Sequence, residues 1–130
     1  MNSSYSEKDL VALYELGRLY YEMGYFAPAE RVFAGLIVID GGITPARVGL
    51  GLVKLERGLF SDAMTHFRMA LQSGCFKVSA YLGLCCSFVA GGELDRARSL
   101  LSQLEREKQL QEDFSPEHKA IRDALQMRCE

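Results

Sequence analysis

Apolar residues recur at spacings of three and four along most of the chain, which is the pattern of amphipathic helices. Near the start, one such set lies on a single helical face: Leu10, Leu13, Leu16, Gly17 and Tyr20. Gly24 follows this run, and a second helical run after it ends at Gly41 and Gly42. Because glycine is common just beyond the end of a helix, the pattern predicts two helices within residues 9–42.

The same pattern returns after 34 residues. Shifting the chain by this length superimposes residues of one kind in several columns: Gly17 and Gly51; Gly49 and Gly83; Gly24, Gly58 and Gly92; Ala29, Ala63 and Ala97; Phe33, Phe67 and Leu101. Seven of the twelve glycines fall in these columns, so they mark a regular scaffold. We predict an all-α chain. Its parts are a flexible leader (1–8), three tandem helix pairs (9–42, 43–76 and 77–107), and a linker with a capping helix (108–130).

The small residues of these columns are expected to bring paired helices close together. Gly17 and Gly51 lie on the first helices of their pairs. We expect Ala29 and Ala63, on the second helices, to lie against them, since a larger side chain would push the helices apart.

Prolines and charges indicate further helix ends. Thr44 precedes Pro45 and Ser115 precedes Pro116, so Thr44 and Ser115 are predicted N-caps. The charged stretch 105–113 is expected to continue the second helix of the third pair, before the capping helix begins.

Composition and charge exclude classes of partner. The 130 residues carry 15 Lys and Arg against 17 Asp and Glu, a net charge of -2. Such a chain has no electrostatic attraction to nucleic acid or to an anionic membrane. The start of the chain lacks the apolar run of a signal peptide, and no apolar run is long enough to span a bilayer. We therefore expect neither a nucleic-acid partner nor membrane insertion.

The residue types that carry chemistry are scattered. Four cysteines are present: Cys75, Cys85, Cys86 and Cys129. They form no CxxC pair and have no histidine at metal-ligand spacing, which favours a reduced cytosolic compartment. The two histidines, His66 and His118, have no nucleophile at a motif spacing. We expect no enzyme activity, no metal and no cofactor.

The columns resemble the tetratricopeptide repeat (TPR) family over about residues 10–107. The first repeat matches the family's consensus at Leu16, Gly17, Tyr20, Gly24, Phe26, Ala29 and Phe33. The third repeat departs from it, with Cys85 at the small position and Leu104 where alanine is usual. The resemblance implies three helix pairs in a right-handed superhelix, followed by a capping helix.

Local segments look like the small TPR chaperones of bacterial type III secretion. The segment 29–40 (AERVFAGLIVID) and residues 48–51 resemble the SycD/LcrH/IpgC group, whose members hold translocator proteins. In its short length the chain instead resembles the YscG group, whose members hold the needle subunit together with a helical co-chaperone. Either resemblance implies a virulence-associated chaperone in the bacterial cytoplasm, with an exported secretion substrate as its partner.

The TPR resemblance implies a concave groove lined by the first helices of the pairs. Carried onto this chain, its predicted partner-binding residues are Val11, Tyr14, Arg18, Tyr21, Val48, Leu52, Leu55, Leu82, Cys86 and Val89. The other positions of the set hold Glu22, Pro45, Glu56, Ser79 and Ala90. Since large exposed apolar surfaces mark binding sites, we predict that the groove holds an apolar or amphipathic segment and prevents its premature self-association.

Two alternatives stay open. The chain's own C-terminal helices could fold over the groove and bury it. The apolar face could also meet a folded protein, as in a general interaction scaffold or assembly adaptor, with a small helical co-chaperone or a second copy of the chain as candidates. A clamp for a C-terminal carboxylate is excluded, because the groove positions lack the required basic and amide side chains.

Overall fold

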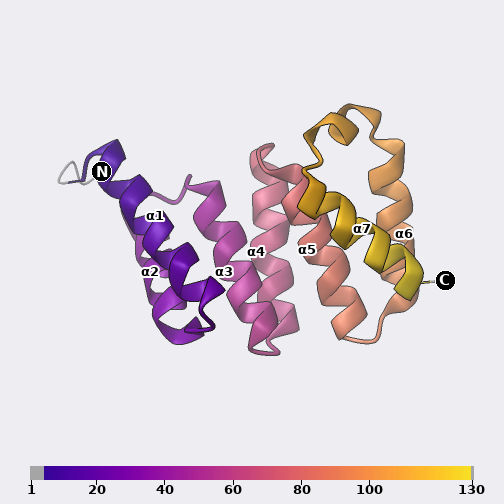
Figure 1. Cartoon of the computed structure of the whole chain (residues 1–130), viewed down its shortest axis with the longest axis horizontal. Helices are drawn as coiled ribbons and strands as arrows, with labels where there is room; N and C mark the ends of the chain where they lie inside the picture. The colour runs from indigo at the N-terminus through magenta and orange to yellow at the C-terminus, as the bar shows by residue number, and fades with distance from the viewer. Residues whose placement is uncertain (1–4, 130) are drawn as a thin grey trace.

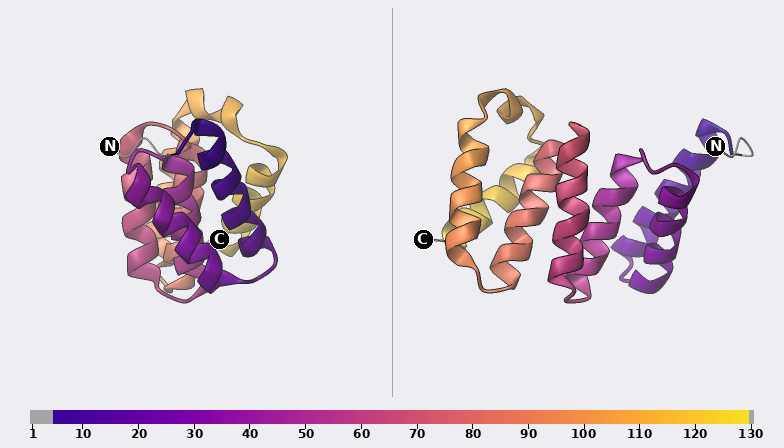
Figure 2. Two further views of the ribbon diagram at one scale, coloured as in Figure 1. Left: turned by 90° about the vertical axis from the view of Figure 1, so that its left-hand side faces the viewer. Right: turned by 180° about the vertical axis from the view of Figure 1, so that it is seen from behind.

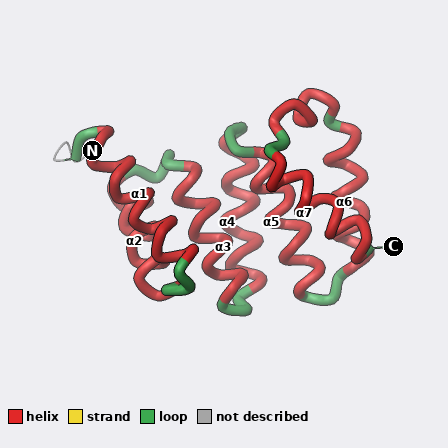
Figure 3. Tube along the Cα trace, viewed as in Figure 1, coloured by secondary structure: helices red, strands yellow, loops and turns green. Residues whose placement is uncertain are grey.

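The computed structural model describes residues 5–129, which form α-helices and one 3-10 helix without a β-strand (Figure 1, Figure 3). The elements are α1 (Glu7–Glu22), α2 (Phe26–Ile39), α3 (Thr44–Glu56), α4 (Phe60–Ser73), α5 (Lys77–Ala90), α6 (Leu94–Arg106), η1 (Lys108–Asp113) and α7 (Pro116–Arg128). The predicted all-α fold of three helix pairs and a C-terminal helix is confirmed. Of the predicted flexible leader (1–8), residues 1–4 lie outside the described residues, and α1 already begins at Glu7.

The three pairs stack side by side into an elongated array that curves (Figure 1, Figure 2). Helix α1 contacts α3, and α3 contacts α5. Among residues 5–129, no comparable contact joins α2 to α4 or α4 to α6. The first helices of the pairs therefore lie closer together than the second helices, so the array bends toward them. We call the surface formed by α1, α3 and α5 the concave face.

A phenylalanine of α2 fills the space between α1 and α3. Phe33 is buried, with Gly17 of α1 on one side and Gly49 of α3 on the other. A Cβ atom at Gly17 would lie 2.7 Å from the Phe33 ring, and one at Gly49 would lie 2.8 Å from it. Carbon atoms in contact sit ~3.5–4.0 Å apart. With the Phe33 ring where it is, residues 17 and 49 therefore have room only for glycine.

Phe67 of α4 occupies the equivalent place between α3 and α5. A Cβ atom at Gly51 would lie 2.7 Å from its ring, and one at Gly83 would lie 2.5 Å from it. At Gly17 and Gly51 the atoms nearest to an added Cβ belong to these rings, so the expectation that Ala29 and Ala63 lie against the glycines stays a prediction. Both alanines are buried, and the rings that lie closest to the glycines come from residues one turn further along the same helices.

The third pair departs from the consensus at both of these positions together. Cys85 stands where Gly17 and Gly51 stand in the earlier pairs, and Leu101 replaces the phenylalanine. Both side chains are buried in one cluster. Since leucine is smaller than phenylalanine, the third pair has room for the cysteine side chain at the helix contact.

Glycines end the first helix of each pair, as predicted. Gly24, Gly58 and Gly92 have φ angles of 82°, 78° and 80°. This left-handed conformation is disfavoured for residues with a Cβ atom, so glycine is needed where the chain reverses into the second helix.

One of the two predicted N-caps is confirmed. Ser115 caps α7, because its Oγ accepts a hydrogen bond from the His118 backbone N–H at 3.0 Å. The prediction for Thr44 was wrong: Thr44 is already helical, and Ile43 precedes α3 without a side-chain cap. The Thr44 hydroxyl instead donates to Ser73 Oγ at 3.1 Å, which joins the start of α3 to the end of α4.

The predicted continuation of α6 through residue 113 was also wrong. Helix α6 ends at Arg106, and the chain turns through η1. Leu110 and Phe114 are buried in the cluster that contains the inner residues of α5 and α6. The turn brings these two apolar side chains into the core, and their burial outweighs the helical propensity of the charged residues around them.

Candidate binding face

The predicted binding residues all lie on the helices of the concave face, but they differ in exposure. Val11 and Arg18 of α1 are exposed, with 57% of Val11 accessible. Val48 of α3 and Leu82 of α5 are buried, at 8% and 3%. The remaining residues are half-buried: Tyr14, Tyr21, Leu52, Leu55, Cys86 and Val89.

Leu82 is buried because the chain covers this part of the concave face itself. Helix α7 crosses α5 and α6 on the same side of the array as α1 (Figure 1, Figure 2). Leu82 shares a buried cluster with Phe114 and Leu125. Near the start of α5, the Ser79 hydroxyl lies 3.0 Å from His118 Nε2 of α7. The alternative of burial by a C-terminal helix thus applies to the N-terminal half of α5, while Cys86 and Val89 keep exposed surface.

Aromatic side chains of α1 form one edge of the face. The centroid of the Tyr14 ring lies 5.9 Å from that of Phe33, and the centroid of the Tyr21 ring lies 5.7 Å from that of Phe26. Burial raises the pKa of Tyr14. These contacts hold the two tyrosines in place on an apolar support, so their remaining exposed edges belong to a rigid surface.

Tyr21, Glu56 and Cys86 bring α1, α3 and α5 together at one end of the face. The Tyr21 hydroxyl donates to Glu56 Oε1 at 3.4 Å, a long hydrogen bond. Burial raises the pKa of Tyr21 to about 12, with the Glu56 charge and the nearby Cys86 thiol adding to the effect. The tyrosine therefore stays neutral and keeps its proton as a donor.

Basic side chains near this end have partners elsewhere. Arg18 pairs with Glu22 at 3.2 Å and lies 3.8 Å from Glu15. Lys54 of α3 and Arg57, just beyond its end, both pair with Glu30 of α2, at 3.5 and 3.0 Å. Within residues 5–129, Glu56 forms no ion pair, and its bond to Tyr21 was not predicted from sequence because the two residues lie 35 positions apart.

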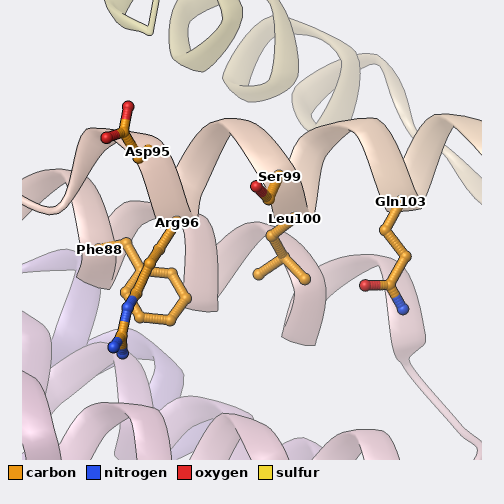
Figure 4. Close-up of a pocket in the computed structure, with 6 residues that line it drawn as sticks. All are labelled: Phe88, Asp95, Arg96, Ser99, Leu100 and Gln103. Atoms are coloured by element: carbon orange, nitrogen blue, oxygen red, sulfur yellow. The ribbon is translucent and has the colours of Figure 1, made fainter.

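A pocket outside the concave face runs along α6, on the side turned away from α7 (Figure 4). It is lined by Phe88, Asp95, Arg96, Ser99, Leu100 and Gln103. Asp95 pairs with Arg98 at 2.9 Å. The pocket contains none of the predicted binding residues, and its polar groups form no arrangement of nucleophile and base.

The groups that could carry chemistry remain dispersed. Residues 5–129 contain no cluster of three potential metal ligands. All four cysteines are free, and burial raises the pKa of the Cys85 thiol to about 12, which makes it a poor nucleophile. His66 is half-buried on α4, and burial lowers its pKa. His118 closes the capping box of α7 by accepting the Ser115 N–H at 3.2 Å.

Comparison with solved structures places this geometry in a known fold. The chain superimposes on SycD, a type III secretion translocator chaperone of Yersinia enterocolitica, with a TM-score of 0.80 and 22% identity, over 95% of this chain and 90% of SycD. PcrH from Pseudomonas aeruginosa gives 0.79 at 21% identity, over 97% and 92%. SycD in complex with a peptide of the translocator YopD gives 0.75 at 22%, over 99% and 100%.

The chain has the fold of the translocator chaperones SycD and PcrH. The predicted resemblance is thus confirmed in three dimensions, over nearly the whole chain. No protein-family model matches the sequence, and no curated protein sequence matches it either. No helix within residues 5–129 combines the length and apolar character that a membrane crossing requires.

Proposed function

We propose that this protein is a cytoplasmic chaperone of a bacterial type III secretion system that binds an apolar or amphipathic segment of an exported translocator on its concave face. The observation that carries the proposal is the apolar surface left open there by Tyr14, Leu52, Leu55, Cys86 and Val89. SycD has been solved with a YopD peptide, and PcrH with the chaperone binding regions of PopB and PopD. These likenesses support a translocator as the cargo over a needle subunit.

The physical basis of the role is burial of apolar surface. An exported apolar segment in water tends to self-associate, because association removes that surface from solvent. A complementary apolar face lowers the concentration of the free segment. Export requires release, so we expect moderate and reversible affinity, far from the strongest known complexes. This role requires binding alone and no catalytic step.

Replacing Leu52 by Asn tests the proposal at the centre of the face. Peptides covering YopD, PopB, PopD and the exported proteins encoded beside this gene would be scanned by fluorescence anisotropy for binding. We expect Leu52→Asn to weaken binding by about tenfold or more, because it places an amide where the cargo buries apolar surface.

Val38→Asn provides the matched control for this experiment. Val38 lies on α2, outside the concave face, and 86% of it is exposed. Binding should be unchanged in this variant, and both variants should keep their helical circular dichroism. Equal affinities of the Leu52→Asn and wild-type chains for the bound peptide would contradict binding on the concave face.

A second contact surface supports self-association. Exposed apolar side chains at helical spacing form a stripe that is separate from the concave positions: Ala12, Leu16 and Leu19 on α1, and Met23 just beyond its end. Among residues 5–129, the helices that contact α1 are α2 and α3, and the stripe stays exposed. SycD has been described as a dimer in one structure of the comparison. We propose that the stripe pairs two copies of this chain, with a helical co-chaperone or a folded adaptor partner as the alternative occupant.

A further inference from the structure

The end of the concave face where α1 and α3 finish is acidic. Glu22 and Glu56 are the last residues of α1 and α3, and the 34-residue period makes them equivalent. A helix C-terminus carries a partial negative charge, so basic residues are favoured there and carboxylates are unfavourable. The last turn of α1 has no basic residue, and that of α3 has Lys54, which pairs with Glu30 of α2. These two glutamates thus work against the stability of the helices that carry them.

The two carboxylates differ in how far the chain neutralises them. Glu22 forms an ion pair with Arg18 of its own helix. Among residues 5–129, the only hydrogen-bond partner of the Glu56 carboxylate is the neutral Tyr21 hydroxyl, at the long distance of 3.4 Å. The two cations nearest to it in sequence, Lys54 and Arg57, pair with Glu30 of α2 instead. Arg122 of α7 contacts the Phe114 ring and Asp123.

Glu56 lies beside the part of the face that stays open. It follows Leu52 and Leu55 on α3 and meets Tyr21, which in turn lies near Cys86. Helix α7 covers the opposite end of α5, where Ser79 contacts His118. A segment that binds the open apolar residues therefore covers Glu56 as well and removes water from its carboxylate.

Covering an ionised carboxylate without a cation is costly, because the lost hydration is not replaced. We infer that the bound segment carries a lysine or arginine next to its apolar residues, and that this cation pairs with Glu56. The inference deepens the proposed function and rests on it. The Tyr21 hydroxyl holds the Glu56 carboxylate in position at the edge of the apolar surface. A segment with an acidic residue at this place is rejected by repulsion from Glu56 and Glu22.

A charge-swap experiment tests the pairing. The probe is the tightest-binding synthetic peptide from the scan described above, resynthesised with each basic residue replaced in turn by norleucine and by glutamate. Each peptide is titrated against the wild-type chain, Glu56→Gln and Glu56→Lys. The control is Glu112→Lys, which makes the same charge change on an exposed residue of η1.

We expect one basic residue of the peptide to be coupled to Glu56. Its replacement by norleucine weakens binding to the wild-type chain about tenfold and leaves binding to Glu56→Gln unchanged. Its replacement by glutamate restores binding to Glu56→Lys, and the Glu112→Lys variant behaves like the wild type. Affinity for the wild-type chain falls at high salt more than affinity for Glu56→Gln.

Two results overturn the inference in distinguishable ways. Peptides that bind with no coupling between any basic residue and Glu56 overturn the pairing and leave the proposed chaperone function standing. A folded wild-type chain that binds none of the translocator peptides overturns the proposed function and the pairing together.

Discussion

At the scale of single residues, each second-helix phenylalanine determines which neighbouring positions must be glycine. Phe33 and Phe67 each touch two glycines from consecutive first helices. The 34-residue period predicted the columns of glycine and phenylalanine, but it did not show that they meet. That pairing depends on how far one helix is rotated against the next, which is settled by packing in three dimensions.

Gly83→Ala should destabilise the chain although alanine favours helices. The added methyl would lie 2.5 Å from a Phe67 ring that Gly51 already confines from the other side. Overpacking of this kind costs about 1–3 kcal/mol. Gly35→Ala is the control, since Gly35 is also helical but has nothing within 4 Å of the added atom. It should stabilise by up to about 1 kcal/mol.

Urea unfolding followed by circular dichroism measures both changes. A Gly83→Ala variant as stable as Gly35→Ala would show that the Phe67 ring can move aside, and that the glycine columns do not set the distance between helices.

At the scale of helices, the sequence predicts starts and stops where they depend on local chemistry. Gly24, Gly58 and Gly92 end helices because of their φ angles, and Ser115 caps α7 through its own side chain. The break after Arg106 could not be predicted in this way. It depends on burying Leu110 and Phe114 against α5, which is a contact between distant segments.

Arg98→Ala should loosen the C-terminal end of α7. The Arg98 guanidinium of α6 donates to the carbonyl oxygen of Cys129, with a distance of 2.8 Å from Nε. Losing this charge-assisted bond at a half-exposed site should cost about 1 kcal/mol. Limited proteolysis should then cleave α7 faster than in the wild-type chain.

Arg96→Ala is the matched control on the same helix, because the only ion pair of Arg96 among residues 5–129 is with Glu93, three positions earlier, and it makes no bond to Cys129. Equal cleavage rates for the two variants would show that α7 is held by its apolar contacts alone, with no measurable part for Arg98.

At the scale of the whole molecule, the curvature of the array and the docking of α7 on α5 decide which apolar surface is open to a partner. The ten residues that the repeat predicted for the groove lie on α1, α3 and α5, with Val48 and Leu82 buried, and their part in binding stays a prediction. The sequence left open whether a C-terminal helix covers the groove, and the burial of Leu82 beside Leu125 of α7 depends on contacts between distant segments. Leu82→Glu would therefore disturb the core of the third pair, whereas Leu52 probes the open face.

The α1 stripe makes a prediction at this scale. Leu19→Glu places a charge on an apolar patch where 53% of Leu19 is accessible. Sedimentation should show the wild-type chain as a dimer and the variant as a monomer, because the charge would be buried between copies. Val38→Glu, an equally drastic change on α2, should leave the dimer intact. A monomeric wild-type chain would remove the stripe from consideration as a self-association surface.

The central position of α5 has a consequence for how the molecule opens. Among the elements within residues 5–129, α5 contacts α3, α4, α6, η1 and α7, whereas α1 contacts only α2 and α3. Local unfolding should therefore begin at the α1–α2 end and reach α5 last, with hydrogen exchange fastest in α1. A cargo segment lying across α1, α3 and α5 would tie the least anchored pair to the best anchored helix. Binding would then slow hydrogen exchange in α1 most. The bound cargo would couple the unfolding of the α1–α2 pair to that of α5, so that the array unfolds more cooperatively than the free chain.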